Sequence, residues 1–215
     1  MDVNPEVPET TAETVASGGG RRQAESERKR QRILESARRC FGDLGFGGAT
    51  VAAIAADADV SNGLLYQFFH NKEHLFEIVL AEVIRDWVRA MVPRDEKSAA
   101  EALEVMFRRS VDFCRTNPLL PALVTGDRSL QLSRISHAGA DRVQPHRDLV
   151  ASILRRGIDS GEFGGDMDVA SVADLICQLH ADYSSRAYRR DPRFPATPEL
   201  IDAAVRFIHD AVRAR

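Results

Sequence analysis

Apolar residues recur at helical spacing through most of this chain, and short polar segments interrupt them. No segment shows a convincing alternation of apolar and polar residues, which is the pattern typical of a half-buried strand. We therefore expect an all-α protein. The longer helices are predicted over residues 25–44, 72–91, 96–116, 139–160, 167–189 and 198–213, with a less regular segment at 118–138 and two short helices between residues 50 and 70.

The two short helices form the stretch on which the rest of the prediction depends. The hydroxyls of Thr50 and Ser61 can cap them by accepting a backbone N–H of each first turn. Asp59 lies between the helices, where Asp tolerates the backbone of a tight turn. Leu65 lies on the side that the second helix buries, and its outward-facing residues are Asn62, Gly63, Leu64 and Gln67. This is the anatomy of a helix–turn–helix, whose second helix enters a DNA major groove.

Charge is unevenly distributed, although the 215-residue chain has a net charge of only −3. Residues 1–20 contain four acidic residues and no Lys or Arg, whereas residues 21–39 contain eight basic residues and three acidic ones. A basic run directly before a helix–turn–helix suits contact with DNA phosphates. Residues 1–24 have few apolar side chains to bury, so we expect a disordered tail there.

The predicted helix over 72–91 is apolar around a wide arc, so it must contact two bodies. We interpret it as a connector between a helix–turn–helix domain over residues 25–71 and a larger helical domain over residues 72–215. Within the larger domain, Pro145 either kinks the helix over 139–160 or marks its start.

Candidate chemistry is sparse. Cys40, Cys114 and Cys177 lie far apart among helix-periodic apolar residues, which favours small buried side chains over a disulfide framework or a metal site. His70 and His74 have a spacing that can bind metal, but no Glu or Cys nearby completes a site. Gly-rich phosphate loops, nucleophile elbows and paired carboxylates are missing from the sequence. We expect no enzyme activity, no bound metal and no cofactor.

The sequence has no signal-peptide core and no apolar run of the ~20 residues that span a bilayer. We expect a cytoplasmic protein that does not enter a membrane.

Between residues 40 and 75 the sequence resembles the TetR family of transcriptional regulators. The matching elements are Cys40-Phe41…Leu44-Gly45-Phe46, Thr50-Val51…Ile54-Ala55…Ala58-Asp59-Val60-Ser61 and Gly63…Leu65-Tyr66…Phe68-Phe69…Lys72-Glu73…Leu75. The resemblance implies a homodimer with one helix–turn–helix per subunit on a palindromic DNA operator. It also implies a small-molecule effector bound among the C-terminal helices.

When the roles of the family's residues are carried over by position, the resemblance implies phosphate contacts at helix N-termini and base contacts along the second short helix. The implied DNA-binding residues are Thr50, Ser61, Asn62, Gly63, Leu64, Tyr66, Gln67 and Lys72. The structural alternatives are simple capping for Thr50 and Ser61, and a core ring with a wet hydroxyl for Tyr66. Two residues depart from the family pattern: Asp59 stands where the family usually has Gly, and Phe68 stands where His or Tyr is common. Leu64 suggests an apolar contact with a base.

The larger domain yields two further sets of residues. Effector-binding candidates are Trp87, Met91, Met106, Phe107, Phe113, Leu123, His137 and His180, for which plain core packing is the alternative. Their character predicts a mostly apolar ligand. The last two helices are expected to form a four-helix bundle with a second copy. The expected interface residues are Val172, Ile176, Leu179, Tyr183, Ile201, Val205 and Ile208.

Together these patterns predict a DNA-binding transcriptional regulator, a repressor that a small, mostly apolar ligand releases from its operator. The alternative is a DNA-binding regulator that a protein partner controls.

Overall fold

The computed structural model describes residues 13–117, 119–120, 135–189, 193 and 195–214, without the side chains of residues 13–19 and 135–143. Apart from an isolated bridge between Phe163 and Arg213, the regular structure of this described part is helical, which confirms the all-α prediction. Its helices are α1 (Glu13–Gly48), α2 (Val51–Asp57), α3 (Asn62–Phe68), α4 (Lys72–Met91), α5 (Ala99–Thr116), α7 (Ile135–Asp159), α8 (Val169–Arg189) and α9 (Pro198–Val212).

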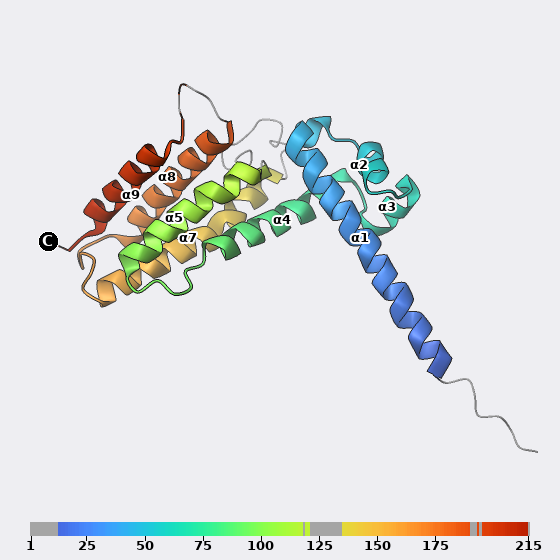
Figure 1. Ribbon diagram of the computed structural model, residues 1–215, viewed down its shortest axis with the longest axis horizontal. Coiled ribbons are helices and arrows are strands. Elements are labelled where there is room, and N and C mark those ends of the chain that lie inside the picture. Colours follow the sequence, from blue (N-terminus) through green and yellow to red (C-terminus); the bar gives the residue numbers. More distant parts are fainter. Residues whose placement is uncertain (1–12, 118, 121–134, 190–192, 194, 215) are drawn as a thin grey trace, which may run out of the picture.

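The first three helices pack as one unit, with α2 and α3 beside the C-terminal half of α1 (Figure 1). Thr50 caps α2 by accepting the backbone N–H of Ala53 at 3.1 Å, and Ser61 caps α3 through Leu64 at the same distance. Asp59 has a φ of 52°, the left-handed conformation of a tight turn. The caps and the turn predicted from the sequence are confirmed.

A cluster of three phenylalanine rings joins this unit to the start of α4. Gly45 has a φ of 69° and interrupts α1, which turns Phe46 into the core. The Phe76 ring of α4 meets the rings of Phe41 and Phe46 edge-on, with centroids 4.9 and 5.0 Å apart. Edge-to-face pairs of this kind add stability to the area that they bury.

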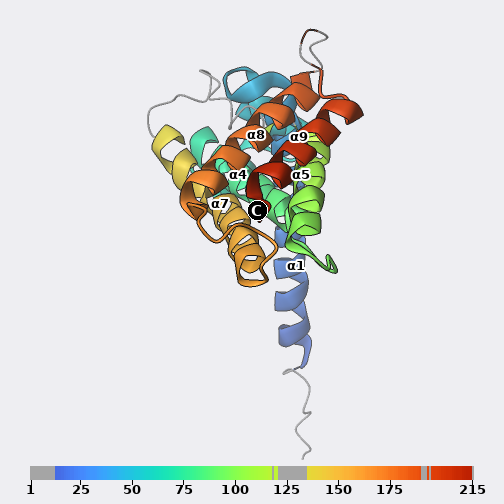
Figure 2. The same ribbon diagram turned by 90° about the vertical axis from the view of Figure 1, so that its left-hand side faces the viewer.

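Helix α4 continues from this cluster into the larger helical domain, where it packs against α5 and α7 (Figure 1). Helix α8 lies against α5 and α7, and α9 covers the outer side of α5 and α8 (Figure 2). Pro145 lies inside α7, ten residues after its start, so the helix does not begin there. Both alternatives for this segment placed the helix start too late.

The N-terminal half of α1 contradicts the expected disordered tail over residues 1–24, because the helix already begins at Glu13. Residues 1–12 lie outside the described part. The segment from Gly20 to Arg28 is exposed throughout. A helix that packing has nucleated at Ile33 and Leu34 gains one hydrogen bond for each residue added, so it extends without further burial.

Candidate nucleic-acid interface and helical-domain core

Helix α3 presents a polar face to solvent. Leu65 is fully buried beneath it, and Leu64 is half-buried rather than fully outward. The exposed residues of the helix and its cap are Ser61, Asn62, Gly63, Tyr66 and Gln67. Tyr66 is 51% exposed, which argues against its alternative role as a core ring. Amide, hydroxyl and backbone groups thus lie together on the surface that a major groove would meet.

The two carboxylates next to α3 are both paired with arginines of α1. Arg39 binds Asp57 at 2.6 Å, and Arg32 lies 3.6 Å from Asp59. The Ser36 hydroxyl and then the Arg39 guanidinium lower the pKa of the Asp57 carboxyl. This pairing offsets the negative charge that would otherwise repel a phosphate backbone.

Lys72 makes contacts that the sequence did not predict. Its ammonium donates to the carbonyl oxygens of Phe46 at 2.9 Å and Ala49 at 3.1 Å, and it lies 4.3 Å from the centre of the Phe46 ring. These contacts fix the segment that leads into Thr50 at the start of α2. No pattern in the sequence indicates them, because the acceptors are backbone carbonyls more than 20 residues away.

The N-terminal half of α1 projects beyond α3, away from the helical domain (Figure 1). The Arg30 guanidinium lies 5.9 Å from the centre of the Phe69 ring just after α3, which places this part of α1 beside the helix. Arg21, Arg22 and Arg28 are exposed, and the described residues include no ion-pair partner for them. Arg21 and Arg28 lie seven residues apart and share one helix face.

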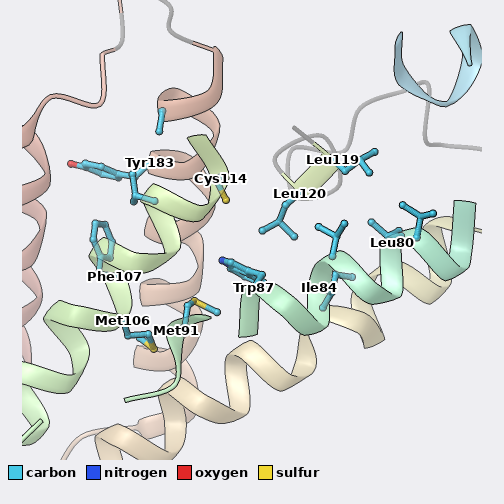
Figure 3. Packing of buried hydrophobic residues seen from close by; sticks show 14 of the residues in the cluster. Leu80, Ile84, Trp87, Met91, Met106, Phe107, Cys114, Leu119, Leu120 and Tyr183 are labelled. Carbon is cyan, nitrogen blue, oxygen red and sulfur yellow. The ribbon is translucent and has the colours of Figure 1, made fainter. Parts of the chain in front are cut away.

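In the helical domain, most of the predicted effector-binding residues converge on one core (Figure 3). Trp87, Met91, Met106, Phe107 and His180 are each at most 3% exposed, and Phe113 is half-buried. Leu123 and the His137 side chain lie outside the described residues. Leu119, Leu120 and Cys114 are further buried residues that follow or end α5 and border this core.

Five aromatic rings from four helices form a continuous chain through that core. In order they are Trp87 of α4, His146 of α7, His180 of α8, Phe107 of α5 and Tyr183 of α8, with successive centroids 4.4, 4.9, 4.6 and 5.5 Å apart. Trp87 also donates its indole N–H to the Ser110 hydroxyl at 3.1 Å. The sequence did not predict a role for His146, since nothing shows that two histidines 34 residues apart are neighbours.

His146 and His180 share a buried hydrogen bond of 2.7 Å between Nε2 and Nδ1. Burial lowers the pKa of His146 to about 4 and that of His180 well below its ordinary value, so both rings are neutral at pH 7. His180 Nε2 is buried without a hydrogen-bond partner, and the buried Ser184 hydroxyl has only the Cys114 thiol beside it. A buried polar atom that stays unpaired destabilises the folded state by about 1–3 kcal/mol, and most such atoms in proteins have a partner.

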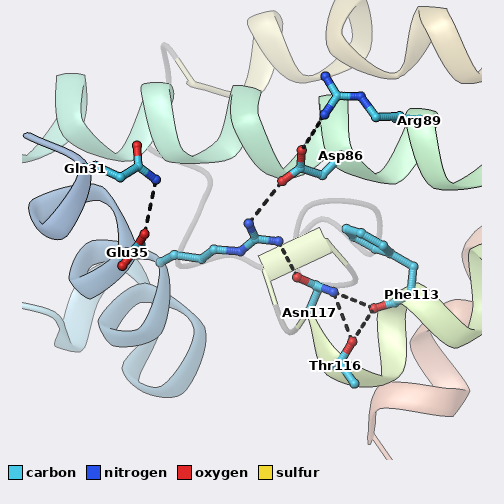
Figure 4. Close-up of polar contacts among 8 residues, drawn as sticks. Gln31, Glu35, Asp86, Arg89, Phe113, Thr116 and Asn117 are labelled. Carbon is cyan, nitrogen blue, oxygen red and sulfur yellow. Dashed lines mark hydrogen bonds and ion pairs between the residues drawn. The ribbon is translucent and has the colours of Figure 1, made fainter. Parts of the chain in front are cut away.

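Arg38 connects the helix–turn–helix unit to the helical domain. Its guanidinium donates to the Asp86 carboxylate of α4 at 3.2 Å and to the Asn117 side-chain oxygen, at the end of α5, at 2.5 Å (Figure 4). A partly open cavity of about 210 Å³ adjoins this contact. It is lined by Arg38, Arg39, Asp43, Val83, Thr116, Asn117 and Leu119.

The expected dimer interface needs correction. Ile176, Tyr183, Ile201, Val205 and Ile208 are buried within the protomer itself, at 3–9% exposure. A helical apolar stripe marks the side that is buried, and here it packs on the protomer's own core. Val172 and Leu179 are only half-buried.

Two large apolar side chains instead face outward from the last helices. Leu175 of α8 is 65% exposed and Phe207 of α9 is 64% exposed. Leu175 shares its helix face with Val172 and Leu179, three residues before and four after it. We call Val172, Leu175, Leu179 and Phe207 the outer face of α8 and α9.

Neither a metal site nor a membrane span is present in the part of the chain that the structure describes. Its His, Cys, Asp and Glu residues form no group of three that could hold a metal ion. The His70 and His74 rings stack with centroids 4.9 Å apart, and His74 Nδ1 accepts the backbone N–H of His70 at 3.3 Å. None of the described helices is long and apolar enough to cross a bilayer.

Comparison with known proteins gives concordant results. Residues 33–79 match the family model described as bacterial regulatory proteins, tetR family. The chain is 31% identical over 170 residues to the HTH-type transcriptional repressor AcnR of Corynebacterium diphtheriae, covering 69% of this chain and 89% of AcnR. It is 29% identical over 182 residues to the repressor KstR2 of Mycobacterium tuberculosis, covering 80% of this chain and 86% of KstR2.

Solved structures share the fold at lower identity. The regulator FadR of Bacillus subtilis, in complex with stearoyl-CoA, superposes with a TM-score of 0.72 at 19% identity, over 85% of this chain and 99% of FadR. The KstR2 structure gives 0.59 at 21%, over 86% of this chain and 95% of KstR2. Because AcnR is matched over most of its length and the helix–turn–helix matches the family model, this chain belongs to the TetR family and is a DNA-binding transcriptional regulator.

Proposed function

We propose that this chain is a homodimeric repressor that leaves a palindromic operator when a small, mostly apolar molecule binds in its helical domain. One observation carries the proposal: α4 belongs to both cores. Phe76, near its start, is buried in the helix–turn–helix unit, whereas Trp87 and Met91, near its end, are buried in the helical-domain core. Because α4 is a single helix, a displacement of its C-terminal end also moves its N-terminal end.

The DNA-binding surface in this proposal is the exposed face of α3, together with the helix starts around it. Ser61, Asn62, Gly63, Leu64, Tyr66 and Gln67 supply contacts from α3 and its cap, and Thr50 and Lys72 supply phosphate contacts from α2 and α4. The exposed arginines in the N-terminal half of α1 extend this surface along the DNA backbone. The helix–turn–helix domain thus comprises α1 to α3, and residues 72–215 form the effector-binding and dimerisation domain.

The effector site lies in the buried core around the five-ring chain. Trp87, Met91, Met106, Phe107, Phe113 and His180 are its described candidates, with Leu123 and His137 as further candidates from the sequence. FadR of Bacillus subtilis, which shares the fold, was solved with stearoyl-CoA. An apolar lining with few polar groups suits a mostly apolar ligand.

Arg38 supports the coupling between the two sites. Through Asp86 and Asn117 it ties α1 to α4 and to the end of α5. Ligand binding among α4, α5, α7 and α8 moves α4, loosens this contact and changes the separation of the two α3 helices in the dimer. Adjacent major grooves on one duplex face lie ~34–36 Å apart, so a shift of a few ångströms favours the released state.

The test is ligand-induced release. A panel of small apolar molecules is screened for compounds that raise the melting temperature, since a ligand that binds the folded state stabilises it. Each compound found is then added to the complex of the full chain with a duplex selected from random sequences. We expect the operator affinity to fall at least tenfold. Stabilising compounds that all leave the operator affinity unchanged would contradict effector control and favour control by a protein partner.

A further inference from the structure

The buried polar atoms of the helical domain are concentrated at one place. His180 Nε2 is buried without a hydrogen-bond partner, and the Ser184 hydroxyl, four residues later on the same face of α8, has only the neighbouring Cys114 thiol beside it. Both side chains are at most 3% exposed. Among the described residues, every other buried side-chain nitrogen or oxygen atom has a hydrogen-bond partner.

The histidine pair leaves His180 Nε2 open whichever tautomer it adopts. If His146 donates its Nε2–H to His180 Nδ1, then His180 carries its proton on Nε2 and offers a donor. If His180 donates from Nδ1, its Nε2 offers an acceptor. The two neutral tautomeric arrangements of the pair therefore offer either a donor or an acceptor at His180 Nε2. A hydroxyl, which donates and accepts, or a carbonyl, which accepts, fits this atom.

The charge of the surroundings limits the partner further. The buried polar residues of the described part are Ser36, Ser110, His146, His180, Ser184 and Ser185. Four are serines, and the histidines have pKa values lowered by burial, so none carries a charge at pH 7. A carboxylate or ammonium group would lose its hydration here without gaining an opposite charge from the buried side chains that the structure describes. A neutral oxygen pays no such penalty.

We propose that His180 Nε2 and the Ser184 hydroxyl anchor the effector through a neutral hydroxyl or carbonyl oxygen on an otherwise apolar body. This inference rests on the proposed effector site and names the chemistry that the site selects. His180 is the binding residue. His146 is a positioning residue, because it holds His180 through Nδ1 while its own ring packs on Trp87 at 4.4 Å. A bound water is the other source of the same oxygen chemistry, and the experiment separates the two.

The experiment uses three probes that share one apolar body: 2-naphthol, naphthalene and 2-naphthoate. Their affinities for the full chain are measured by calorimetry at pH 7. A hydrogen bond to an otherwise unpaired buried group is expected to make 2-naphthol bind roughly ten- to a hundredfold more tightly than naphthalene. The charged 2-naphthoate is expected to bind more weakly than 2-naphthol. Nitrogen NMR of labelled histidine should show the His180 resonances shift with 2-naphthol and not with naphthalene.

Single substitutions test the anchor through the ratio of two affinities, which is measured within each folded variant. His180→Phe keeps an aromatic ring and removes the nitrogens, and Ser184→Ala removes only the hydroxyl. Each should reduce the preference for 2-naphthol over naphthalene, while Leu154→Met, at a fully buried residue of α7 outside the candidate set, should preserve it. His146→Phe should change the His180 nitrogen resonances in the free protein, because it removes the partner of Nδ1.

The outcomes distinguish a failure of the polar anchor from a failure of the effector site. Equal affinities for 2-naphthol and naphthalene, unchanged in Ser184→Ala, would overturn the polar anchor and assign the two atoms to a retained water. The effector site itself would stand, because naphthalene still binds. No binding of any probe would overturn the effector site and the anchor together. Tighter binding of 2-naphthoate than of 2-naphthol would overturn the selection of a neutral group.

Discussion

At the scale of single residues, several side chains have roles that depend on what they contact and not on their type. Lys72 resembles a phosphate-contacting lysine by position, yet its ammonium also holds the carbonyls of Phe46 and Ala49. His146 resembles an ordinary polar residue of a helix, yet it is 3% exposed and hydrogen-bonded to His180. Both roles lead to measurable expectations.

Lys72→Ala should weaken both folding and DNA binding. Loss of two charge-assisted hydrogen bonds and of the contact with the Phe46 ring should lower the free energy of unfolding by about 1–2 kcal/mol. The affinity for every duplex sequence should fall, because the lost DNA contact is to phosphate. Urea unfolding and fluorescence anisotropy measure the two effects, with Lys97→Ala, at an exposed residue of the helical domain, as the control. Unchanged unfolding in Lys72→Ala would refute the structural role.

The histidine pair predicts a loss of stability in acid. His146 has an unfolded-state pKa of ~6.5 and a folded-state pKa of about 4, so the unfolded chain binds more protons between these values. The contribution of neutral His146 to the free energy of unfolding is therefore fully present above pH 6.5. It is lost as the pH decreases toward 4, and the loss from His146 alone is about 3 kcal/mol. The lowered pKa of His180 acts in the same direction.

Urea unfolding between pH 7 and pH 4.5 tests this expectation. His146→Phe should reduce the slope of stability against pH, whatever its stability at pH 7, and the exposed-site control His70→Gln should not. Parallel slopes for the wild type and His146→Phe would mean that His146 is not buried as a neutral ring.

At the scale of helices, the N-terminal half of α1 and the outer face of α8 and α9 carry surfaces that no other described part of the chain covers. Residues 20–28 are exposed and include three arginines with no ion-pair partner among the described residues. Leu175 and Phe207 expose most of their apolar surface. An exposed basic helix and an exposed apolar face point to different partners, DNA and a second copy of the chain.

Replacing Arg21, Arg22 and Arg28 with Ala should weaken binding to every duplex and reduce its dependence on salt. Each phosphate contact contributes a slope of about −0.9 in a plot of log affinity against log salt. Loss of all three contacts should therefore make the slope shallower by about 2–3. The double variant Gln23→Ala, Ser26→Ala lies on the same segment and keeps its charge. Identical salt slopes for the triple and double variants would show that this helix does not contact DNA.

Leu175→Glu combined with Phe207→Glu should separate the dimer. Each of the two side chains contributes about 1.5–3 kcal/mol when it is fully buried, and each occurs twice across a two-fold interface. The dimer dissociation constant should rise by at least about a hundredfold, as measured by sedimentation equilibrium. Val92→Glu, at a residue 41% exposed on another surface, is the control. A double variant that stays dimeric at the same concentrations would place the interface elsewhere.

These elements also show what the sequence could predict. Helical periodicity and the caps Thr50 and Ser61 predicted the helices, because both depend on residues close in sequence. Periodicity marked Ile201 correctly as an inward residue but could not tell whether it packs on its own protomer or on a copy. The His146–His180 pair could not be predicted, since it depends on how α7 packs against α8.

At the scale of the whole molecule, one helix and one arginine connect the helix–turn–helix unit to the helical domain. Helix α4 is buried at both ends, and Arg38 links α1 to α4 and α5 beside the cavity between the domains. An arrangement of this kind transmits a displacement only if the helix moves as a rigid body. His180, the proposed polar anchor, belongs to the chain of aromatic rings that ends at Trp87 of α4. Helix α4 therefore contacts the proposed ligand site at one end and supports α3 at the other.

Recognition of a palindromic operator by α3 can be measured by comparing two duplexes. Fluorescence anisotropy compares the affinity of the full chain for a palindromic duplex, selected from random sequences, with that for a scrambled duplex of equal length at one salt concentration. We expect at least a thousandfold preference for the palindrome, which Gln67→Ala should reduce. Equal affinities of the wild type for the two duplexes would contradict it.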